Sequence, residues 1–373
     1  MAIYNNTNGK LGFGLMRLPK KGEEFDLEQI NAMVDRFMEA GFTYFDTAWA
    51  YEWSEEAMRK SLVERYPRES YQVATKLSAW IRCETREDAM HQFDVSLERS
   101  GLEYFDYYLL HNLGMPRSEY YDRFDLWSFV QELKAEGKAR HIGISYHGQA
   151  DELEQILDAH PEIEFVQIQL NYADMENDNI QSRKNYELIT ARGIPVIVME
   201  PVKGGLLAAP PAQVEEIFRA AEPETSPAVW ALRFAADLDN VLIVLSGMSS
   251  LEQMEDNLKA LKGFRKLTPA QAETLREARE ALASIPLIPC TSCNYCAKVC
   301  PMNIGVSGTL TAMNYLTIYG NLEYAKGQEG WLVVRHGKAR ANECIECGAC
   351  EEACPQHIEI RAELRRAVEA LGI

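Results

Sequence analysis

Short apolar runs alternate with amphipathic stretches along the chain from Leu11 to about Leu261. The runs are rich in β-branched and aromatic residues, which favours strands, and eight of them lie at 11–16, 43–47, 72–76, 105–110, 141–145, 165–169, 195–199 and 241–246. Between these runs the apolar positions recur at helical spacing. Eight βα units over roughly 250 residues have the size and rhythm of a closed (β/α)8 TIM barrel. A doubly wound sheet would show the same alternation with fewer units.

Helix start signals fall between the predicted strands. A capping side chain is followed three residues later by a partner at 26–29, 85–88 and 249–252. A further start has Thr268 as N-cap, Pro269 at the first helical position and Gln271 at N3. Pro286 and Pro289 then interrupt the chain. We therefore predict an α/β barrel domain at 1–285 and a smaller domain at 286–373.

The smaller domain contains eight of the nine cysteines of the chain. They form two runs, each reading C-x2-C-x2-C-x3-C-P, and in this bacterial spacing the fourth cysteine ligates the other of two [4Fe-4S] clusters. Zinc sites more often use paired C-x2-C knuckles, and disulfides do not suit a cytosolic chain. The pattern therefore favours two clusters, one on Cys290, Cys293, Cys296 and Cys354, the other on Cys344, Cys347, Cys350 and Cys300.

The segment between the two cysteine runs is longer than a minimal ferredoxin needs. Its apolar residues at 310–319 have helical spacing. We therefore expect an α-helical ferredoxin-like domain rather than the small β-hairpin type. Cys83 stands alone in the sequence and is interpreted as an ordinary thiol.

The charge of the chain excludes some partners. In its 373 residues, 38 Lys and Arg face 56 Asp and Glu, which gives a net charge of −18, whereas nucleic-acid binders hold phosphates with Lys and Arg. No apolar run approaches the ~18 residues of a membrane span, and residues 1–10 do not read as a signal peptide. We expect a cytoplasmic protein with no nucleic-acid or membrane partner, and the clusters suggest an anaerobic redox setting.

Titratable residues close three consecutive predicted strands: Asp46, Lys76 and His111. Tyr51 follows Asp46 on the next loop, and the carboxyl ends of barrel strands carry the chemistry of such folds. A tyrosine with a pKa of about 10 is a poor acid, but Lys76, held by Asp46, would lower that pKa. A neutral His111 could donate a hydrogen bond to a carbonyl. This set suits protonation of a C=O group while a hydride arrives from elsewhere.

These four residues, in the contexts FDTAWAY, VATKL and YLLHN, resemble the catalytic tetrad of the aldo-keto reductases. The resemblance implies a barrel that binds a nicotinamide cofactor across its carboxyl face. It places Ser145 and Gln167 at the carboxamide and Met199 on the nicotinamide ring. The last βα segment would contact the adenosine end of the cofactor through Ser246, Gly247, Ser249, Gln253 and Asn257.

The choice between NADP and NAD stays open, because the family's basic pair for the 2′-phosphate maps near Gly247 and Gln253. Lys203 is a candidate phosphate contact, and the alternative is a solvated loop lysine.

With its cysteines, the chain resembles a ferredoxin-fused branch of the aldo-keto reductases. This implies an NAD(P)H-dependent oxidoreductase for a small-molecule carbonyl or alcohol, with clusters that are structural or exchange electrons with a redox partner protein. A hydride carries two electrons and each cluster passes one. The alternative is therefore an electron-transfer protein whose clusters pass single electrons to a substrate or flavin in the barrel.

Overall fold

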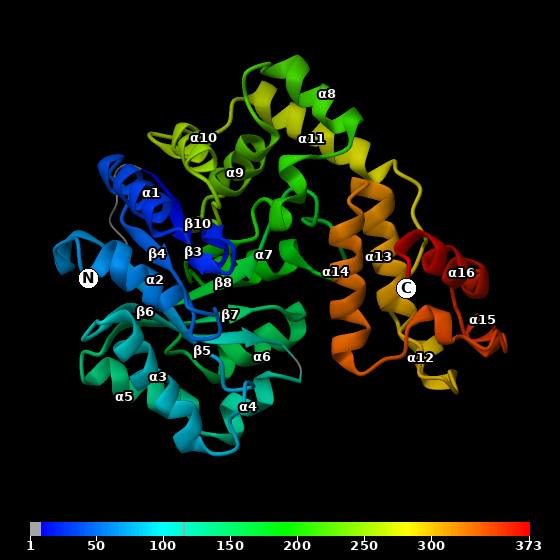
Figure 1. Ribbon diagram of the computed structural model, residues 1–373, viewed down its shortest axis with the longest axis horizontal. Helices are drawn as coiled ribbons and strands as arrows, with labels where there is room; N and C mark the ends of the chain where they lie inside the picture. The colour runs from blue at the N-terminus through cyan, green and yellow to red at the C-terminus, as the bar shows by residue number, and fades with distance from the viewer. Residues whose placement is uncertain (1–8, 115) are drawn as a thin grey trace. The chain divides into compact units, whose positions relative to one another are not determined.

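A closed barrel of eight parallel strands forms the larger part of the protein in a computed structural model, which describes residues 9–114 and 116–373 (Figure 1). The order around the barrel is β1-β10-β9-β8-β7-β6-β5-β4. Every predicted strand is present, and the predicted fold class is confirmed. The barrel strands are β1 (Leu11–Gly14), β4 (Tyr44–Asp46), β5 (Gln72–Leu77), β6 (Phe105–Leu113), β7 (Ala139–Tyr146), β8 (Phe165–Gln169), β9 (Val196–Met199) and β10 (Val241–Ser246).

The first strand is shorter than predicted. It ends at Gly14, and a 3-10 helix, η1 (Leu15–Arg17), replaces its expected last two residues. The ladder stops there because both neighbours stop: Gly14 pairs with Asp46, and Phe13 pairs with Ser246. A small antiparallel hairpin of β2 (Lys20–Lys21) and β3 (Glu24–Phe25) follows.

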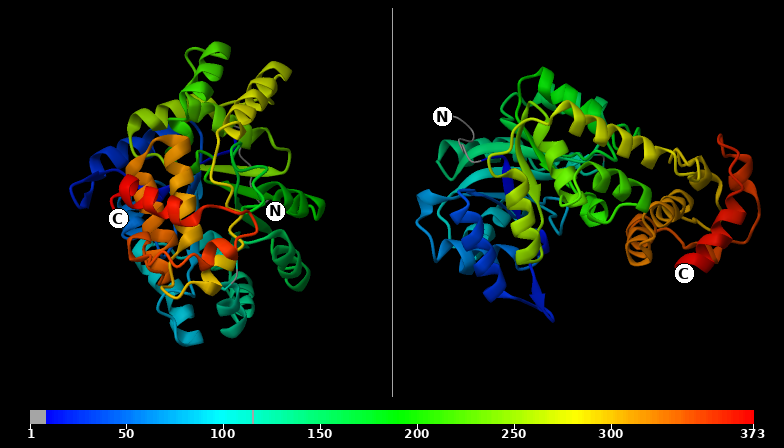
Figure 2. Two further views of the ribbon diagram at one scale, coloured as in Figure 1. Left: turned by 90° about the vertical axis from the view of Figure 1, so that its right-hand side faces the viewer. Right: turned by 90° about the horizontal axis from the view of Figure 1, so that it is seen from above.

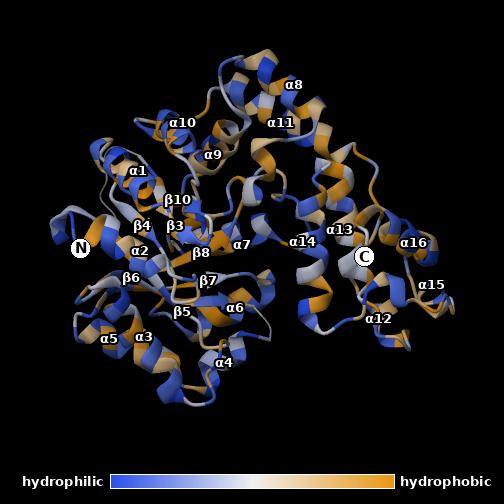
Figure 3. Cartoon of the chain, viewed as in Figure 1, coloured by the Kyte–Doolittle hydropathy of each residue, from blue (hydrophilic) through white to orange (hydrophobic). Residues whose placement is uncertain are grey.

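Amphipathic helices follow the barrel strands, with hydrophilic and hydrophobic residues alternating along them (Figure 3). Asp26 caps α1 by accepting from Gln29 N at 3.2 Å, and Thr85 and Asp88 form the predicted capping box of α3. The barrel helices are α1 (Leu27–Glu39), α2 (Ser54–Met58), α3 (Arg86–Ser100), α4 (Ser118–Arg123), α5 (Leu126–Ala135), α6 (Ala150–Ala159), α7 (Ser182–Ala191), α9 (Pro227–Asp237) and α10 (Leu251–Leu261).

The start of α10 lies one residue later than predicted. Ser250, not Ser249, is the N-cap and accepts from Gln253 N at 3.2 Å. The Ser249 hydroxyl donates instead to the carbonyl oxygen of Arg17 at 2.7 Å. A contact with η1, which follows the adjacent strand β1, therefore uses the side chain that the local pattern assigned to capping.

The interior of the barrel is filled by apolar side chains that the strands turn inward, Tyr44, Ala74, Tyr107, Leu109, Phe165, Ile197, Ile243 and Leu245. Gly12 faces this layer, and a Cβ there would lie 2.7 Å from side-chain atoms of Ile243 and Leu245. Only glycine therefore fits at this point of β1. The larger apolar layer lies between the strands and the surrounding helices.

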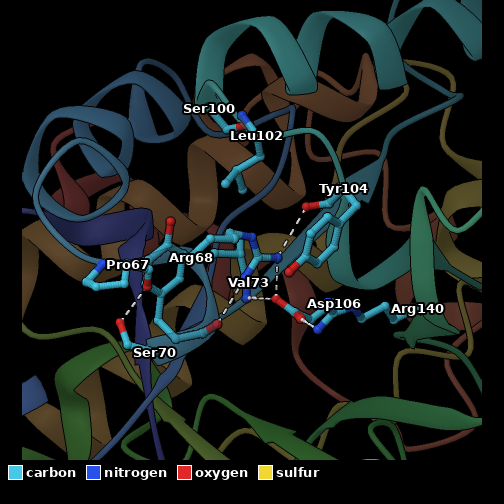
Figure 4. A network of polar contacts seen from close by, with 10 residues as sticks. Pro67, Arg68, Ser70, Val73, Ser100, Leu102, Tyr104, Asp106 and Arg140 are labelled. Atoms are coloured by element: carbon cyan, nitrogen blue, oxygen red, sulfur yellow. Dashed lines mark hydrogen bonds and ion pairs between the residues drawn. The ribbon is translucent and has the colours of Figure 1, made fainter.

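A charged network ties the starts of β5, β6 and β7 together (Figure 4). The buried carboxylate of Asp106 accepts from Arg68 Nη2 at 2.7 Å, from Val73 N at 2.9 Å and from Arg140 Nη1 at 3.0 Å. The two guanidinium groups also lie over the ring of Tyr104, 4.0 and 4.1 Å from its centroid. Both oxygens of the carboxylate are thus used at the amino end of the barrel.

The chain divides into two compact units. One contains the described residues up to Ala208 together with Glu222–Leu275, and the other contains Ala209–Ala221 and Arg276–Ile373. Helix α11 (Pro269–Ala283) runs across the division at 275/276, close to the predicted boundary near 285. Where an independently folding domain begins stays a prediction.

The second unit is helical. α13 (Val306–Tyr319), which covers the helix expected at 310–319, packs on α14 (Leu322–Leu332) and α16 (Ile360–Leu371) (Figures 1 and 2). The unit also contains α8 (Ala212–Ala221), α12 (Tyr295–Val299) and α15 (Ala349–Glu352). α8 bonds to the end of α11, where Gln213 Nε2 donates to Ala281 O at 2.8 Å. In the described residues, no helix has the length and apolar character that crossing a membrane requires.

Candidate active site and cysteine cavities

An ion pair connects the ends of the neighbouring strands β4 and β5. Lys76 is completely buried, and its ammonium donates to Asp46 Oδ1 at 2.5 Å and to Thr47 O at 2.6 Å. Burial lowers the pKa of Lys76, but Asp46 and Tyr51 raise it by more, so the net direction is upward. Lys76 therefore carries its charge at the carboxyl end of the barrel.

The loop that carries Tyr51 is closed by short hydrogen bonds. The hydroxyls of Thr47 and Ser54 lie 2.8 Å apart, and Ser54 also donates to Leu15 O at 3.0 Å. Further along, the Thr75 hydroxyl donates to the buried carboxylate of Glu55 at 2.7 Å, which ties α2 to β5. These bonds fix the loop against the two strands that hold Asp46 and Lys76.

Tyr51 lies between Lys76 and His111. The Lys76 ammonium is 5.0 Å from the centroid of the Tyr51 ring, and the rings of Tyr51 and His111 meet edge to face at 5.8 Å. Burial raises the pKa of Tyr51, while Lys76 opposes that rise without cancelling it. The prediction that the pKa of Tyr51 is lowered was wrong for this reason, although the contribution of Lys76 has the expected sign.

His111 is held in the neutral form. Burial, reinforced by Lys76, His147 and Arg117, puts the pKa of His111 well below its usual range. Its Nδ1 lies 2.8 Å from the Ser78 hydroxyl. If that hydroxyl donates to Nδ1, the ring proton is on Nε2.

Sequence reasoning missed the residues that fix the backbone of His111. The carbonyl oxygen of His111 accepts from the buried hydroxyl of Tyr121 and, at 3.3 Å, from Trp80 Nε1. The rings of Trp80 and His111 lie 6.3 Å apart. Ser78 and Trp80 come two and four residues after Lys76. Their position just after a predicted strand end is the sequence feature that could have identified them.

The two predicted carboxamide contacts are neighbours. Ser145 pairs in register with Gln167 across β7 and β8. The Ser145 hydroxyl oxygen accepts from Asn112 N at 2.7 Å, so its proton is available to another partner. Gln167 Oε1 is buried and has no hydrogen-bond partner among the described residues. A buried amide oxygen of this kind fits the amide donor of a nicotinamide carboxamide.

Lys203 is not a solvated loop lysine. It is buried, it lies at φ +51° in the 3-10 helix η4 (Lys203–Ala208), and its ammonium bonds to the Asp174 carboxylate. Asn171 Nδ2 donates to the same carboxylate at 2.9 Å. The phosphate contact of Lys203 stays a prediction. Met199, at the end of β9, is partly buried against the interior apolar layer.

The residues predicted at the adenosine end gather where β10 meets α10. Asn257 Nδ2 donates to the Ser246 hydroxyl at 2.7 Å, and Ser249 N donates to Gln253 Oε1 at 2.8 Å. Gly247 directly follows Ser246 in the chain. The predicted segment is therefore one local cluster at the carboxyl end of β10.

The cysteines of the second unit surround two cavities. One is lined by Cys290, Cys293, Cys296 and Cys354, and the other by Cys300, Cys344, Cys347 and Cys350. These are the two sets that crossed ligation requires. All nine cysteines are free thiols, and among the described residues no three His, Cys, Asp or Glu side chains converge as they would on a single metal ion. Four thiols around a cavity fit a [4Fe-4S] cluster.

Residues 10–280 match the profile of the Aldo/keto reductase family, and residues 289–359 match that of the 4Fe-4S dicluster domain. The chain belongs to the aldo/keto reductase family. An aldo-keto reductase of Mycolicibacterium smegmatis is 31% identical over 276 residues, 73% of this chain and 87% of the relative. An oxidoreductase of Schizosaccharomyces pombe is 27% identical over 265 residues, 67% of this chain and 81% of the relative.

Solved aldo-keto reductases share the fold. A holo form from Bacillus halodurans aligns with a TM-score of 0.59 at 24% identity, over 73% of this chain and 92% of that protein. A reductase from Klebsiella pneumoniae in complex with NADPH aligns with a TM-score of 0.58 at 20% identity, over 74% and 96%. The protein is thus an oxidoreductase of the aldo/keto reductase family that also carries a 4Fe-4S domain.

Proposed function

We propose that the protein is an NADPH-dependent reductase of small-molecule aldehydes or ketones. The observation that carries this proposal is the convergence of Asp46, Tyr51, Lys76 and His111 at the ends of three neighbouring strands. NADP(H) is favoured over NAD(H) because structurally similar reductases from Klebsiella pneumoniae were solved with NADP and NADPH.

Each of the four side chains has its own role in the proposed reduction of a carbonyl. A bound reduced nicotinamide supplies a hydride to the carbonyl carbon. The Tyr51 hydroxyl gives its proton to the carbonyl oxygen, so that hydride and proton together convert C=O to an alcohol. Lys76, held by Asp46, stabilises the phenolate left on Tyr51. Neutral His111 donates from Nε2 to the same oxygen and orients it.

The cofactor would lie over β7 to β10. In this proposal Ser145 and Gln167 hold the carboxamide, Met199 packs on the ring and Lys203 faces a phosphate. The local cluster at the start of α10, Ser246, Gly247, Ser249, Gln253 and Asn257, holds the adenosine end. Support comes from the unsatisfied Gln167 Oε1 and from the grouping of the α10 residues.

The second unit would hold two [4Fe-4S] clusters, one in each four-cysteine cavity. Cluster one takes Cys290, Cys293, Cys296 and Cys354, and cluster two takes the remaining four. Their role is structural, or they exchange electrons with a redox partner protein.

Replacing Tyr51 with Phe tests the reductase. The Tyr51→Phe enzyme should lose about 10²- to 10⁴-fold in kcat/KM for aldehyde reduction, because the proton donor is gone. Binding of NADPH, measured by fluorescence, should stay within about twofold. Tyr66→Phe is the matched control, since the Tyr66 hydroxyl bonds to Asp35 on α1, outside the set of four residues. Unchanged turnover of Tyr51→Phe would reject the proposed function.

The two four-cysteine cavities also support a second candidate, electron transfer from the clusters to a substrate or flavin in the barrel. Here dithionite-reduced protein should convert a carbonyl substrate without nicotinamide, and Tyr51→Phe should not slow it. No turnover under these conditions rejects this candidate and leaves the first untouched.

A further inference from the structure

The backbone of Ser78, which directly follows β5, is held by a side chain from another element. Gln92 lies on α3 and is 3% exposed. Its Oε1 accepts from Ser78 N at 2.8 Å, and its Nε2 donates to Ser78 O at 3.2 Å. One buried amide therefore satisfies both backbone polar groups of Ser78 and fixes this residue just beyond the end of the strand.

The surroundings of the Gln92 amide allow it only one orientation. Its Nε2 also donates to Ile81 O at 3.4 Å and to Cys83 Sγ at 3.2 Å. Exchanging the nitrogen and the oxygen would place a donor against Ser78 N and an acceptor against two carbonyl oxygens. Ile81 N in addition donates to Ser78 O at 2.9 Å, which closes a turn. Gln92 therefore binds the whole start of the loop after β5.

Gln92 and His111 are held by the same packing of a helix on a strand. Phe93, the residue after Gln92, contacts two aromatic rings of β6 edge to face, that of Tyr108 at 5.0 Å and that of Phe105 at 5.9 Å. β6 also carries His111. A shift of Gln92 relative to His111 would therefore disrupt aromatic contacts between α3 and this strand.

The hydroxyl of Ser78 has a single partner. Ser78 is completely buried, and its Oγ lies 2.8 Å from His111 Nδ1, its only hydrogen-bond partner within residues 9–114 and 116–373. If Nδ1 carried the ring proton and donated it, the hydroxyl proton of Ser78 would be buried without an acceptor, which is unfavourable. The hydroxyl therefore donates to Nδ1. Because His111 is neutral, its one ring proton is then on Nε2.

We propose that Gln92 is a positioning residue of the reductase: it holds Ser78 so that the Ser78 hydroxyl keeps the ring proton of His111 on Nε2. This inference rests on the proposed carbonyl reduction, in which Nε2 donates to the carbonyl oxygen. A ring with its proton on Nδ1 would turn a lone pair toward that oxygen and repel it. Without the Gln92 amide the backbone of Ser78 is released, and its hydroxyl no longer selects one tautomer. Gln92 acts through Ser78 and needs no contact of its own with the substrate.

A double-mutant cycle tests whether Gln92 acts through Ser78. Holoenzyme with intact clusters is assayed for aldehyde reduction with NADPH. Gln92→Met keeps the length of the side chain but removes its amide, and it should lower kcat by about 10- to 100-fold, because the carbonyl oxygen loses a correctly oriented donor. The KM for NADPH should stay within about twofold, and Ser78→Ala should give a similar loss of kcat.

The double variant decides between a positioning role and a merely structural one. In the Ser78→Ala background, Gln92→Met should change kcat by less than about threefold, since the hydroxyl that it positions is already gone. Losses that multiply in the double variant would mean that Gln92 does not act through Ser78, and they would overturn the proposal.

Thr85→Ala is the matched control for a general loosening of α3. The Thr85 hydroxyl accepts from Asp88 N at 3.1 Å and caps the same helix. Its removal weakens the cap and leaves the Gln92 amide in place. The kcat of this variant should stay within about threefold of wild type. A loss as large as that of Gln92→Met would show that the stability of α3, rather than the amide, sets the rate, and it would overturn the proposal.

Nitrogen NMR of the oxidised holoenzyme reads the tautomer without turnover. The protein is prepared with isotope-labelled histidine, and the spectrum of His111→Gln identifies the signals of His111 among the seven histidines. Wild type should show a protonated Nε2 and an unprotonated Nδ1 on His111. In Gln92→Met the two nitrogen signals should move toward each other, as they do when a ring exchanges between both tautomers.

The spectra also separate this inference from the proposed function. If wild-type protein reduces no aldehyde, the proposed function fails, and the spectra alone decide about Gln92. A proton on Nδ1 of His111 in wild type, or His111 signals that Gln92→Met leaves in place, would overturn the assignment.

Discussion

Two buried aspartates lie near opposite ends of the barrel strands and are satisfied to different degrees. At the amino end, Asp106 uses both carboxylate oxygens, with Arg68, Val73 and Arg140 as donors (Figure 4). At the carboxyl end, Asp46 binds Lys76 through Oδ1, and its buried Oδ2 has no hydrogen-bond partner in the described part of the chain. The first arrangement is complete by itself, whereas the second leaves one buried carboxylate oxygen without a donor among the described residues. In barrels of this kind one end serves stability and the other serves chemistry.

The largest effect should come from removing the lysine of the carboxyl end. Lys76→Met should lower kcat/KM for carbonyl reduction by about 10²- to 10⁴-fold, because nothing then stabilises the Tyr51 phenolate. Arg68→Met, the corresponding change at the amino end, should leave kcat/KM within about threefold. Steady-state assays of both variants measure the difference in kcat/KM. A similar loss in both would contradict the view that only the carboxyl end of the barrel carries the chemistry.

Removing the aspartate of the amino end should affect stability instead. Asp106→Asn should lower the free energy of unfolding of the barrel by about 2–3 kcal/mol, because a buried pair loses its charge while both arginines remain. Its kcat/KM should not change. Urea denaturation followed by circular dichroism gives the free energy. Asp158→Asn removes an exposed partner of Arg192 and should cost less than about 1 kcal/mol. Equal losses would mean that burial of Asp106 adds nothing.

Acid should destabilise the protein through the carboxyl end. Folded His111 stays neutral where the unfolded chain takes up a proton, near pH 6.5, because its folded pKa is well below the usual range. The unfolded state then binds more protons, so stability falls as the pH drops below about 6.5, by up to about 1.4 kcal/mol per pH unit for this group.

The measurement compares free energies of unfolding between pH 7 and pH 5. His111→Gln should flatten the slope relative to wild type, whereas His91→Gln, at an exposed position of α3, should retain it. If wild type and His111→Gln have the same slope, folded His111 titrates as the unfolded chain does, and its neutral form is not enforced.

The smallest effect should come from the outer arginine of the amino-end network. The Arg140 side chain is 54% exposed, against 21% for Arg68. Arg140→Met leaves Asp106 with Arg68 and Val73 and should cost about 1 kcal/mol or less, with Arg68→Met costing more. The same denaturation assay ranks the two, and the reverse order would show that exposure does not set the strength of these pairs.

The sequence predicted the barrel well because each strand is a short run of β-branched and aromatic residues between helical stretches. The prediction failed where the end of a strand or the cap of a helix depends on a residue far away in the sequence. β1 ends at Gly14 because β4 and β10 end beside it, and Ser249 does not cap α10 because its hydroxyl reaches Arg17. Neither partner strand nor the position of Arg17 is visible in the local pattern.

The candidate site shows the same limit. Strand ends identified the positions of Asp46, Lys76 and His111, since the carboxyl ends of parallel strands meet at one edge. The direction of the Tyr51 pKa and the burial of Lys203 could not be read from the sequence, because both depend on how deeply the folded chain encloses a side chain. The grouping of the cysteines in two crossed sets followed from spacing alone, since that spacing is specific.

The discontinuous second unit has a consequence for the order in which the protein is made. α8 leaves the ribosome before the rest of its unit, because Arg276–Ile373 is synthesised later. Until the end of α11 emerges, Gln213 cannot donate to the carbonyl of Ala281, and residues 212–221 lack this partner on the nascent chain. A chain that stops at 275 would carry this helix without its partner. A gene fragment that begins at 276 would encode the cysteines but lack the helix, so the two units cannot be separated by one cut.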